Sequence, residues 1–209
     1  MIRVAPEGWR FIVPAWILVA LLAGFQVWWG VLLWLPIAVW VVAFFRDPPR
    51  PGPRGDRLVI APADGLVVSV LDIDEPAFMG TTSRRISIFM NVFNCHVNRY
   101  PVSGRIAFRQ YHPGRFVNAA DEKASLENEQ SSVGLETPHG RVLVRQIAGL
   151  VARRIVTDHA EGTLTTQGDR MGMIRFGSRV DLFLPMGAKV MVKEGDHTVA
   201  GVTVVAEWA

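Results

Sequence analysis

The chain has 209 residues, a length that favours one main domain. Half of the residues are hydrophobic and 20% are charged, which excludes a disordered protein, because disorder combines low hydrophobicity with high net charge. Cys95 is the only cysteine, so an intrachain disulfide and a cysteine-rich zinc site are excluded. The formal net charge of +3 is too small to indicate a nucleic-acid partner, and we expect none.

The N-terminal segment is apolar over a long stretch, because residues 11–45 include no charged side chain. This is longer than the apolar core of a signal peptide, about 7–15 residues, and longer than one membrane-spanning helix of about 20 residues. Gly24, Gln26 and Gly30 lie near its middle, where the chain would reverse. We predict a membrane-associated helical hairpin over residues 1–45, either spanning the bilayer twice or dipping into one leaflet. A buried pair of core helices is the alternative, although core helices usually carry a polar stripe.

A Pro/Arg linker follows over residues 46–57. Its four prolines and two glycines prevent the helix from continuing. Its four arginines follow the apolar segment, and Arg3 and Arg10 precede that segment. Positive charge at both ends predicts that both ends of the hairpin lie at the cytoplasmic face of the cell membrane.

From residue 58 onward the pattern changes to short runs rich in Val, Ile and aromatic residues, separated by Gly, Pro and Asp. It predicts a mainly β catalytic domain over residues 58–209, and segments 59–67 and 195–205 look like strands of a barrel-sandwich. The one helical signal, Asn118–Gln130, lies in a long polar connection between His112 and Gly140. The predicted strands are 58–61, 66–71, 85–92, 105–111, 141–147, 151–156, 173–184, 189–192 and 202–208.

Residues 93–104 form the first stretch that is suited to chemistry. They place His96 and Arg99 in a loop between two predicted strands, and such a pair can serve acid/base chemistry and anion binding. Cys95 is interpreted as a core residue, because neighbours in an extended chain point to opposite faces. His96 and Asn98 alone do not supply the three or four ligands of a zinc site, so we expect no metal.

Two further stretches contain Asp64, in the turn at 61–65, and the pair Gly177-Ser178, in the β-rich run at 168–185. Taken singly, each has an ordinary structural interpretation: Asp-Gly is a common turn, and a glycine in a strand often marks a bulge. Asp64 becomes a functional candidate if its carboxylate reaches His96 or a nucleophile. Gly177 would leave its own carbonyl open to attack, because it has no side chain.

In this order and spacing, the stretches resemble the phosphatidylserine decarboxylase proenzymes of the short bacterial and archaeal type. The resemblance covers nearly the whole chain. It implies a self-processing lyase of phospholipid biosynthesis that converts phosphatidylserine in the membrane to phosphatidylethanolamine and CO2. The matching segments, after the apolar N-terminus, are 61–65, 93–104, 111–116, 124–129, 146–155 and 168–185.

The resemblance implies that the Ser178 hydroxyl attacks the Gly177 carbonyl and converts the amide to an ester. Elimination through dehydroalanine then leaves an N-terminal pyruvoyl group. The products are a β chain, residues 1–177, and an α chain, residues 178–209, which stay associated. The pyruvoyl carbonyl takes the substrate amine as a Schiff base and supplies the electron sink that pyridoxal phosphate provides in other enzymes, so no pyridoxal phosphate is expected.

Roles for the remaining residues follow from the same resemblance. His96 is the candidate acid that reprotonates carbon after CO2 is lost, and Arg99 or Arg179 would hold the phosphodiester. Many longer members carry a second histidine three residues after the position of His96, which acts in self-cleavage with the serine and an aspartate at the position of Asp64. Arg99 stands there in this chain and cannot act as a base at neutral pH. Either His96 serves both reactions, or Asp64 and backbone strain suffice for cleavage. Arg179 replaces the usual threonine after the serine.

Two other classes remain open from the residues alone. A membrane-anchored barrel-sandwich carrier or adaptor fits the strand pattern and predicts an intact chain. A membrane-bound hydrolase would use Ser178 with His96 and Asp64, but the chain lacks the usual Gly-x-Ser-x-Gly elbow.

Overall fold

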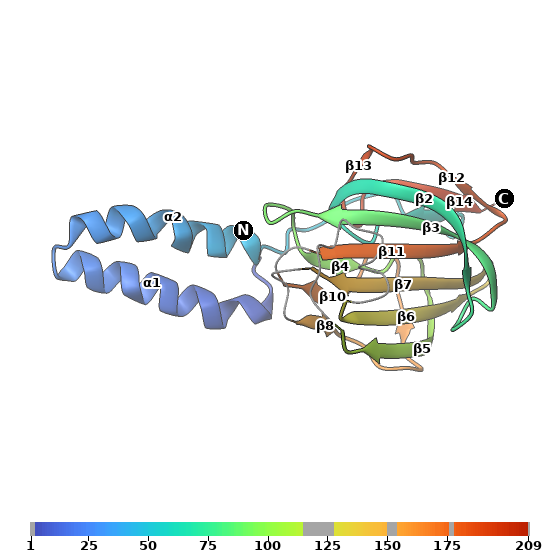
Figure 1. Ribbon diagram of the computed structural model, residues 1–209, viewed down its shortest axis with the longest axis horizontal. Coiled ribbons are helices and arrows are strands. Elements are labelled where there is room, and N and C mark those ends of the chain that lie inside the picture. The colour runs from blue at the N-terminus through green and yellow to red at the C-terminus, as the bar shows by residue number, and fades with distance from the viewer. Residues whose placement is uncertain (1–2, 115–127, 150–153, 176–177, 209) are drawn as a thin grey trace. The chain divides into compact units, whose positions relative to one another are not determined.

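The computed structural model describes residues 3–114, 128–149, 154–175 and 178–208. The chain divides into two compact units, Met1–Pro49 and Arg50–Ala209. The first unit contains the helices and the second contains the strands (Figure 1). The division falls inside the Pro/Arg segment at 46–57, where proline prevents regular structure.

The first unit is the predicted helical hairpin. It consists of a 3-10 turn, η1 (Pro6–Gly8), and two helices, α1 (Trp9–Gly24) and α2 (Trp28–Phe44). The reversal lies at residues 25–27, where Gln26 adopts the left-handed φ of 57°. The indole Nε1 of Trp34 donates to the carbonyl oxygen of Ala15 at 3.1 Å, so this polar group is satisfied by the opposite helix.

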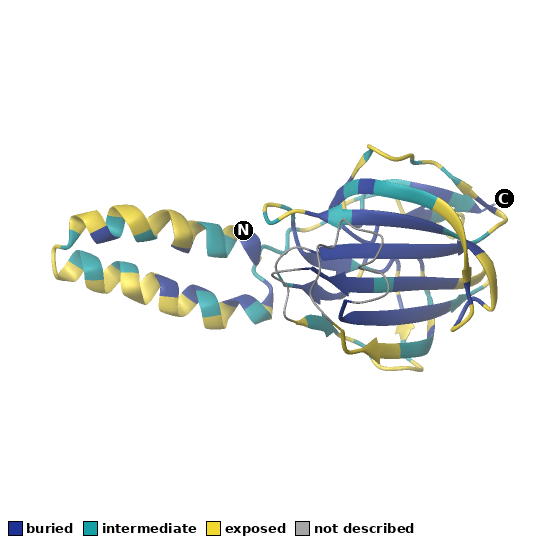
Figure 2. Cartoon of the chain, viewed as in Figure 1, coloured by how far each residue is buried: buried dark blue, intermediate teal, exposed yellow. Residues whose placement is uncertain are grey.

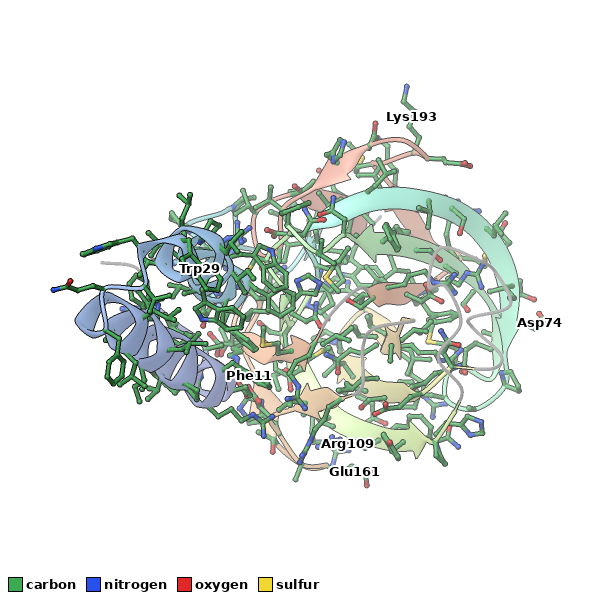
Figure 3. The ribbon with its side chains drawn as sticks, turned by 60° about the vertical axis from the view of Figure 1, so that its left-hand side comes forward. Phe11, Trp29, Asp74, Arg109, Glu161 and Lys193 are labelled. Carbon is green, nitrogen blue, oxygen red and sulfur yellow. The ribbon has the colours of Figure 1, made fainter. Side chains whose placement is uncertain are left out.

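The outer faces of the hairpin are apolar and exposed (Figure 2). Phe25 is 77% exposed, Leu32 76% and Trp29 72%, and Figure 3 shows Trp29 on this unit. Core helices would bury such side chains, so the core-helix alternative is wrong. In the described residues, the helical stretch Pro6–Gly24 is long and apolar enough to cross a membrane, whereas α2 is apolar but has 17 residues.

The second unit contains one eight-stranded sheet and two three-stranded sheets in the described residues, with antiparallel pairing throughout. The large sheet curls into a half-barrel (Figure 1), which confirms the mainly β prediction. Its strands, in spatial order, are β13 (His197–Thr198), β2 (Gly65–Glu75), β3 (Thr81–Met90), β11 (Ser178–Pro185), β7 (Gly140–Ala148), β6 (Gln130–Thr137), β5 (Gly104–His112) and β9 (Leu164–Thr165). The small sheets are β1 (Leu58–Ile60), β14 (Val204–Trp208) and β12 (Ala188–Val190), and β4 (Val97–Arg99), β10 (Arg170–Ile174) and β8 (Ile155–Thr157).

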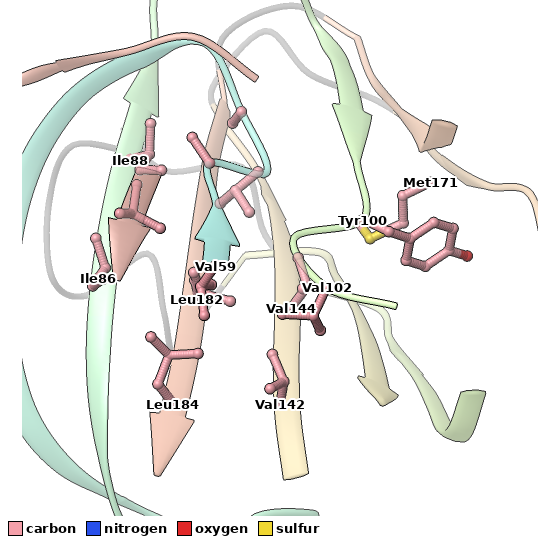
Figure 4. Close-up of a cluster of buried hydrophobic side chains, with 14 of the residues drawn as sticks. Val59, Ile86, Ile88, Tyr100, Val102, Val142, Val144, Met171, Leu182 and Leu184 are labelled. Carbon is pink, nitrogen blue, oxygen red and sulfur yellow. The ribbon is translucent and has the colours of Figure 1, made fainter. Parts of the chain in front are cut away.

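Strand β11 lies between β3 and β7 in the large sheet and is buried along nearly its whole length. Alternate residues of a strand point to opposite faces, so β11 supplies two buried surfaces. Val180, Leu182 and Leu184 face the main core. Phe183 packs on the other face with Phe78 and its neighbours. Figure 4 shows part of the main core, in which Ile86, Ile88, Val142, Val144, Leu182 and Leu184 lie along adjacent strands.

Three strands were missed by sequence analysis, β4, β6 and β9, whereas β13 lies within the strand-like segment 195–205. The expected helix Asn118–Gln130 is wrong at its C-terminal end, because Gln130 is the first residue of β6. The expected long polar connection between His112 and Gly140 is also wrong, because it contains β6. Residues 118–127 of that helix lie outside the described residues.

Strand β6 has a polar sequence but is buried, because its serines have hydrogen-bond partners. Ser131 bonds to Thr157 at 2.8 Å, and Ser132 accepts from Arg145 at 3.1 Å. The expected run at 173–184 is two strands, one ending at Ile174 and the other beginning at Ser178.

Candidate active site

Ser178 is the first residue of β11 and lies directly opposite Met90 of β3 and Ala148 of β7. Directly paired residues share a face of the sheet, so the three side chains point to the same side as Val180, toward the core. Ser178 is fully buried, and its Oγ has no hydrogen-bond partner among the described residues. Burying an unpaired hydroxyl costs about 1–3 kcal/mol. Such a group in a native protein calls for an explanation, and a catalytic role is one of them.

Gly177, the other half of the expected cleavage site, lies outside the described residues.

His96 immediately precedes β4 and is fully buried. Its Nδ1 lies 3.1 Å from the carbonyl oxygen of Asn94. A carbonyl oxygen only accepts, so Nδ1 carries a hydrogen, and Nε2 is the ring nitrogen left to exchange a proton. The carbonyl of His96 accepts from the backbone N–H of Ile174 at 3.3 Å. This bond connects the histidine to the end of β10, four residues before Ser178.

Asp64 lies just before β2, two strands from β11 in the sheet order, which corresponds to roughly 10 Å at about 4.8 Å per strand. Its Oδ2 accepts from Arg50 Nη2 at 2.7 Å, and its Oδ1 accepts from the backbone N–H of Ala200 at 2.7 Å. In the described part of the chain these bonds go to neither His96 nor Ser178. Asp64 is therefore anchored beside the site by a cation and a backbone donor.

The two candidate arginines lie in different environments. Arg179 faces away from Ser178, because consecutive residues of β11 point to opposite faces of the sheet. It is 2% exposed, and its Nη2 donates to Asp181 Oδ2 at 3.0 Å. Arg99 is half-buried at the end of β4, where its Nη1 donates to the carbonyl oxygen of Gly168 at 3.1 Å. The structure thus places Arg179 in an internal ion pair on the far side of the sheet.

Arg99 belongs to a basic cluster that also contains Arg50 and Arg54. Arg54 Nη1 donates to the carbonyl oxygen of Gly201 at 2.7 Å. A Cβ added to Gly201 would lie 2.9 Å from Arg99 Cδ and 3.2 Å from Arg50 Cβ. Because Gly201 also has a φ of +73°, a side chain there would be strained and would push the arginines apart.

Cys95 is buried, as expected for a core residue. Burial raises the pKa of its thiol above the ordinary value, so this cysteine is a poor nucleophile near neutral pH.

A buried chain of polar side chains was missed by sequence analysis. Gln146 Nε2 donates to Asn98 Oδ1 at 2.8 Å, and Thr157 Oγ1 donates to Gln146 Oε1 at 3.0 Å. Thr157 Oγ1 also bonds to Ser131 Oγ at 2.8 Å. The sequence does contain a signal that Gln146 is buried. Alternate residues of strand β7 face the core, and Gln146 follows Val142 and Val144 in that alternation, so a polar residue occupies a core-facing position.

Tyr100, directly after β4, is also buried, and its hydroxyl lies 3.1 Å from His159 Nδ1. Burial raises the pKa of Tyr100 to about 12. Because the folded pKa exceeds the unfolded value near 10, the stabilisation is complete below pH 10 and is lost as pH rises through 12. We expect the free energy of unfolding of the native chain to fall over that range relative to Tyr100→Phe.

The measurement is denaturant unfolding of both proteins from about pH 9 to 12, beside a tyrosinate absorbance titration. Tyr111→Phe leaves Tyr100 as the only tyrosine. An absorbance step near pH 10 in that variant would contradict the expectation.

A cavity of about 620 Å³ lies elsewhere in this unit. It is lined by Trp208 and by the turn between β6 and β7, including Pro138 and His139. That turn is at the end of β7 opposite Ala148, so the cavity is remote from Ser178. Within the described ranges, no cluster of three or more His, Cys, Asp or Glu could hold a metal ion.

Comparison with known proteins gives consistent similarities. The sequence model of the family described as phosphatidylserine decarboxylase matches residues 37–206. A phosphatidylserine decarboxylase proenzyme of Magnetococcus marinus is 48% identical over 204 residues, covering 96% of this chain and 93% of the relative. A protein of the same name from Symbiobacterium thermophilum is 47% identical over 203 residues, covering 97% of this chain and 94% of the relative.

Proposed function

The chain belongs to the phosphatidylserine decarboxylase family and decarboxylates phosphatidylserine, and on this premise we propose that self-cleavage between Gly177 and Ser178 creates its active site. The observation that carries the proposal is the buried Ser178 hydroxyl without a described hydrogen-bond partner. A hydroxyl that no acceptor or donor holds is available to attack the preceding carbonyl.

The strand pairing supports continued association of the two products. Residues 178–208 supply β11, β12, β13 and β14, and each of these strands pairs with another in a sheet. Strand β11 lies between β3 and β7, and β14 pairs with β1. Cutting the chain before Ser178 leaves these hydrogen bonds and the shared core in place, so the α chain stays bound to the β chain.

The proposed pyruvoyl group would replace Ser178 at the start of β11. When present, it supplies an electron sink for the negative charge left on carbon after CO2 departs. The buried position of Ser178 excludes water from that centre, which strengthens electrostatic interactions there. His96 is the proposed proton donor to carbon, and burial fixes its ring through the bond from Nδ1 to Asn94.

We assign the phosphodiester contact to Arg99 rather than Arg179. Arg99 lies in the basic cluster with Arg50, three residues after His96, whereas the charge of Arg179 is balanced by Asp181 on the other face of the sheet. A guanidinium group binds phosphate oxygens through two N–H donors. Asp64 pairs with Arg50 of the same cluster at 2.7 Å.

We place the enzyme at the cytoplasmic face of the cell membrane, held by the hairpin. Its helices have 16 and 17 residues, so each is about 24–26 Å long at 1.5 Å per residue. Exposed Trp28 and Trp29 lie at the tip, and Arg10 and Arg46 lie near the base. A hairpin with aromatic residues at its tip and arginines near its two ends is typical of a segment that contacts the membrane interface.

Intact-mass measurement of the purified protein tests the cleavage directly. We expect two chains, ending at Gly177 and beginning at residue 178, with the α chain carrying a pyruvoyl group in place of a free serine amine. The carrier alternative predicts a single intact chain, so one mass spectrum decides between them. Release of labelled CO2 from phosphatidylserine should accompany the cleaved form.

Deleting residues 1–45 should make the protein largely soluble without stopping self-cleavage, because the cleavage site belongs to the other unit. Activity on phosphatidylserine in vesicles should fall more than activity on a short-chain soluble analogue. Flotation with vesicles measures binding, and the two substrates are assayed with the same preparation. Unchanged binding would instead assign anchoring to the arginines of segment 46–57 acting on anionic lipid.

A further inference from the structure

We propose that Asn98 is a catalytic residue of self-cleavage, whose Nδ2–H stabilises the carboxylate that leaves when the ester at Ser178 is eliminated. The inference rests on the proposed cleavage between Gly177 and Ser178. It concerns a residue that has no counterpart among the Ser, His and Asp candidates discussed above.

The side chain of Asn98 lies over the beginning of β11. Its Nδ2 is 3.7 Å from Met90 Sδ on β3, and its Oδ1 accepts from Gln146 on β7 at 2.8 Å. These two strands flank β11 on either side. Met90 is the direct partner of Ser178, and Gln146 is the direct partner of Val180. All these side chains belong to the core-facing side of the sheet, so the Asn98 amide is positioned above residues 178–180.

The hydrogen bonds also determine which end of the Asn98 amide faces Met90, the strand partner of Ser178. A thioether sulfur cannot donate, so the Asn98 atom that faces Met90 must be the N–H donor. Oδ1 then accepts from Gln146, and Gln146 Oε1 in turn accepts from Thr157. The single hydroxyl hydrogen of Thr157 goes to Gln146, so Thr157 accepts from Ser131 at 2.8 Å. The chain therefore runs in one direction, and successive bonds of this kind strengthen one another in a buried setting.

Among the residues that the structure describes, the donor at the end of this chain has only a weak acceptor. Sulfur is a weak acceptor, and a distance of 3.7 Å to Met90 is long. Asn98 is fully buried, so water does not complete its bonding. A stronger acceptor formed beside Met90 would capture this N–H, and Ser178 Oγ is the atom on the paired residue that becomes such an acceptor.

Elimination is the step in which that oxygen gains charge. A base of the site removes the Cα hydrogen of Ser178, the Cα=Cβ double bond forms, and the Cβ–Oγ bond breaks. The electron pair of that bond leaves with Oγ, which becomes a carboxylate oxygen of Gly177. An N–H donor held beside Met90, the residue paired with Ser178, would be worth more in this transition state than in the starting ester, because Oγ gains charge as the bond breaks.

Trapping the ester tests the proposal. Asn98→Ala and Asn98→Asp should slow release of the α chain by about 10²–10³-fold, the usual effect of one lost oxyanion donor. The Asp variant keeps the volume and still accepts from Gln146, but it presents a carboxylate instead of an N–H. Both variants should accumulate a chain of full mass that hydroxylamine splits into a β chain ending in a hydroxamate and an α chain beginning with serine.

Gln167→Ala is the matched control. Gln167 is also a buried amide, and its Nε2 donates to the carbonyl oxygens of Leu58 at 2.6 Å and Pro101 at 3.1 Å. It should lose stability in a thermal melt without accumulating ester. Native rates of α-chain release in folded Asn98→Asp, or a full-mass chain that hydroxylamine leaves intact, would overturn the proposal. If the native protein itself yields no chain beginning at residue 178, the proposed cleavage site is wrong instead.

Discussion

Ser178→Ala is expected to leave one uncut chain with no decarboxylase activity. Without the hydroxyl, nothing begins the shift of the Gly177 acyl group from nitrogen to oxygen. The substitution removes a buried oxygen that has no described hydrogen-bond partner, so the fold should be kept or slightly stabilised, because no bond is lost and a desolvation cost is relieved. A denaturing gel, intact mass and labelled CO2 release from the same preparation measure the three expectations.

Ser178→Cys provides the matched control for that experiment. A thiol can also attack the carbonyl, so slow cleavage is expected while alanine gives none. Two fragments from the alanine variant would show that the cleavage assignment is wrong. A marked loss of stability in the alanine variant would show that the hydroxyl has a structural partner after all.

His96→Ala is expected to give α and β chains but an enzyme whose decarboxylation is slowed by about 10²–10⁴-fold, the usual contribution of general acid catalysis. The expected cleavage follows from the position of Arg99, which stands where longer family members keep the histidine used in cleavage. Loss of the bond to Asn94 also removes one anchor of the loop, so a melting curve must accompany the assay. A gel for chain splitting and CO2 release are read from one preparation.

If folded His96→Ala neither cleaves itself nor decarboxylates phosphatidylserine, His96 acts in both reactions. Near-normal decarboxylation would remove His96 from the site, and His112 and His139 would be the next candidates for the proton donor. The structure weakens the case for His139, which stacks on Trp208 at 5.3 Å beside the remote cavity. His112 is the last residue of β5 and precedes, along the chain, the segment 118–130 that was predicted to be a polar helix.

Much of the architecture could be predicted because it depends on local patterns. A long uncharged stretch interrupted near Gln26 gives a helical hairpin whatever the rest of the chain does, since helical hydrogen bonds are made within each helix. Alternation of Val180, Leu182 and Leu184 likewise assigns one face of β11 to the core. The same alternation places Ser178 and Arg179 on opposite faces of β11, so the orientation of Arg179 follows from the sequence of this strand.

Polar residues were predicted less well. The sequence of β6 looks like part of a loop because hydrophobic period is the main sequence signal for a strand. Its serines are nonetheless buried, because partners on other strands satisfy them, among them Thr157 and Arg145. Sequence pattern shows which groups are polar, but it does not show which distant groups will pair with them.

The sequence by itself determined the β-rich class, the apolar hairpin and, by resemblance, the Gly177-Ser178 pair as the centre of the chemistry. Only the tertiary structure decided which side chains lie near Ser178. Asn98, Gln146 and Thr157 come from three strands separated along the chain and meet over β11, while Asp64 is bound to Arg50 and Ala200. Such meetings depend on sheet order and register, which are set by the packing of the whole core rather than by any local run of residues.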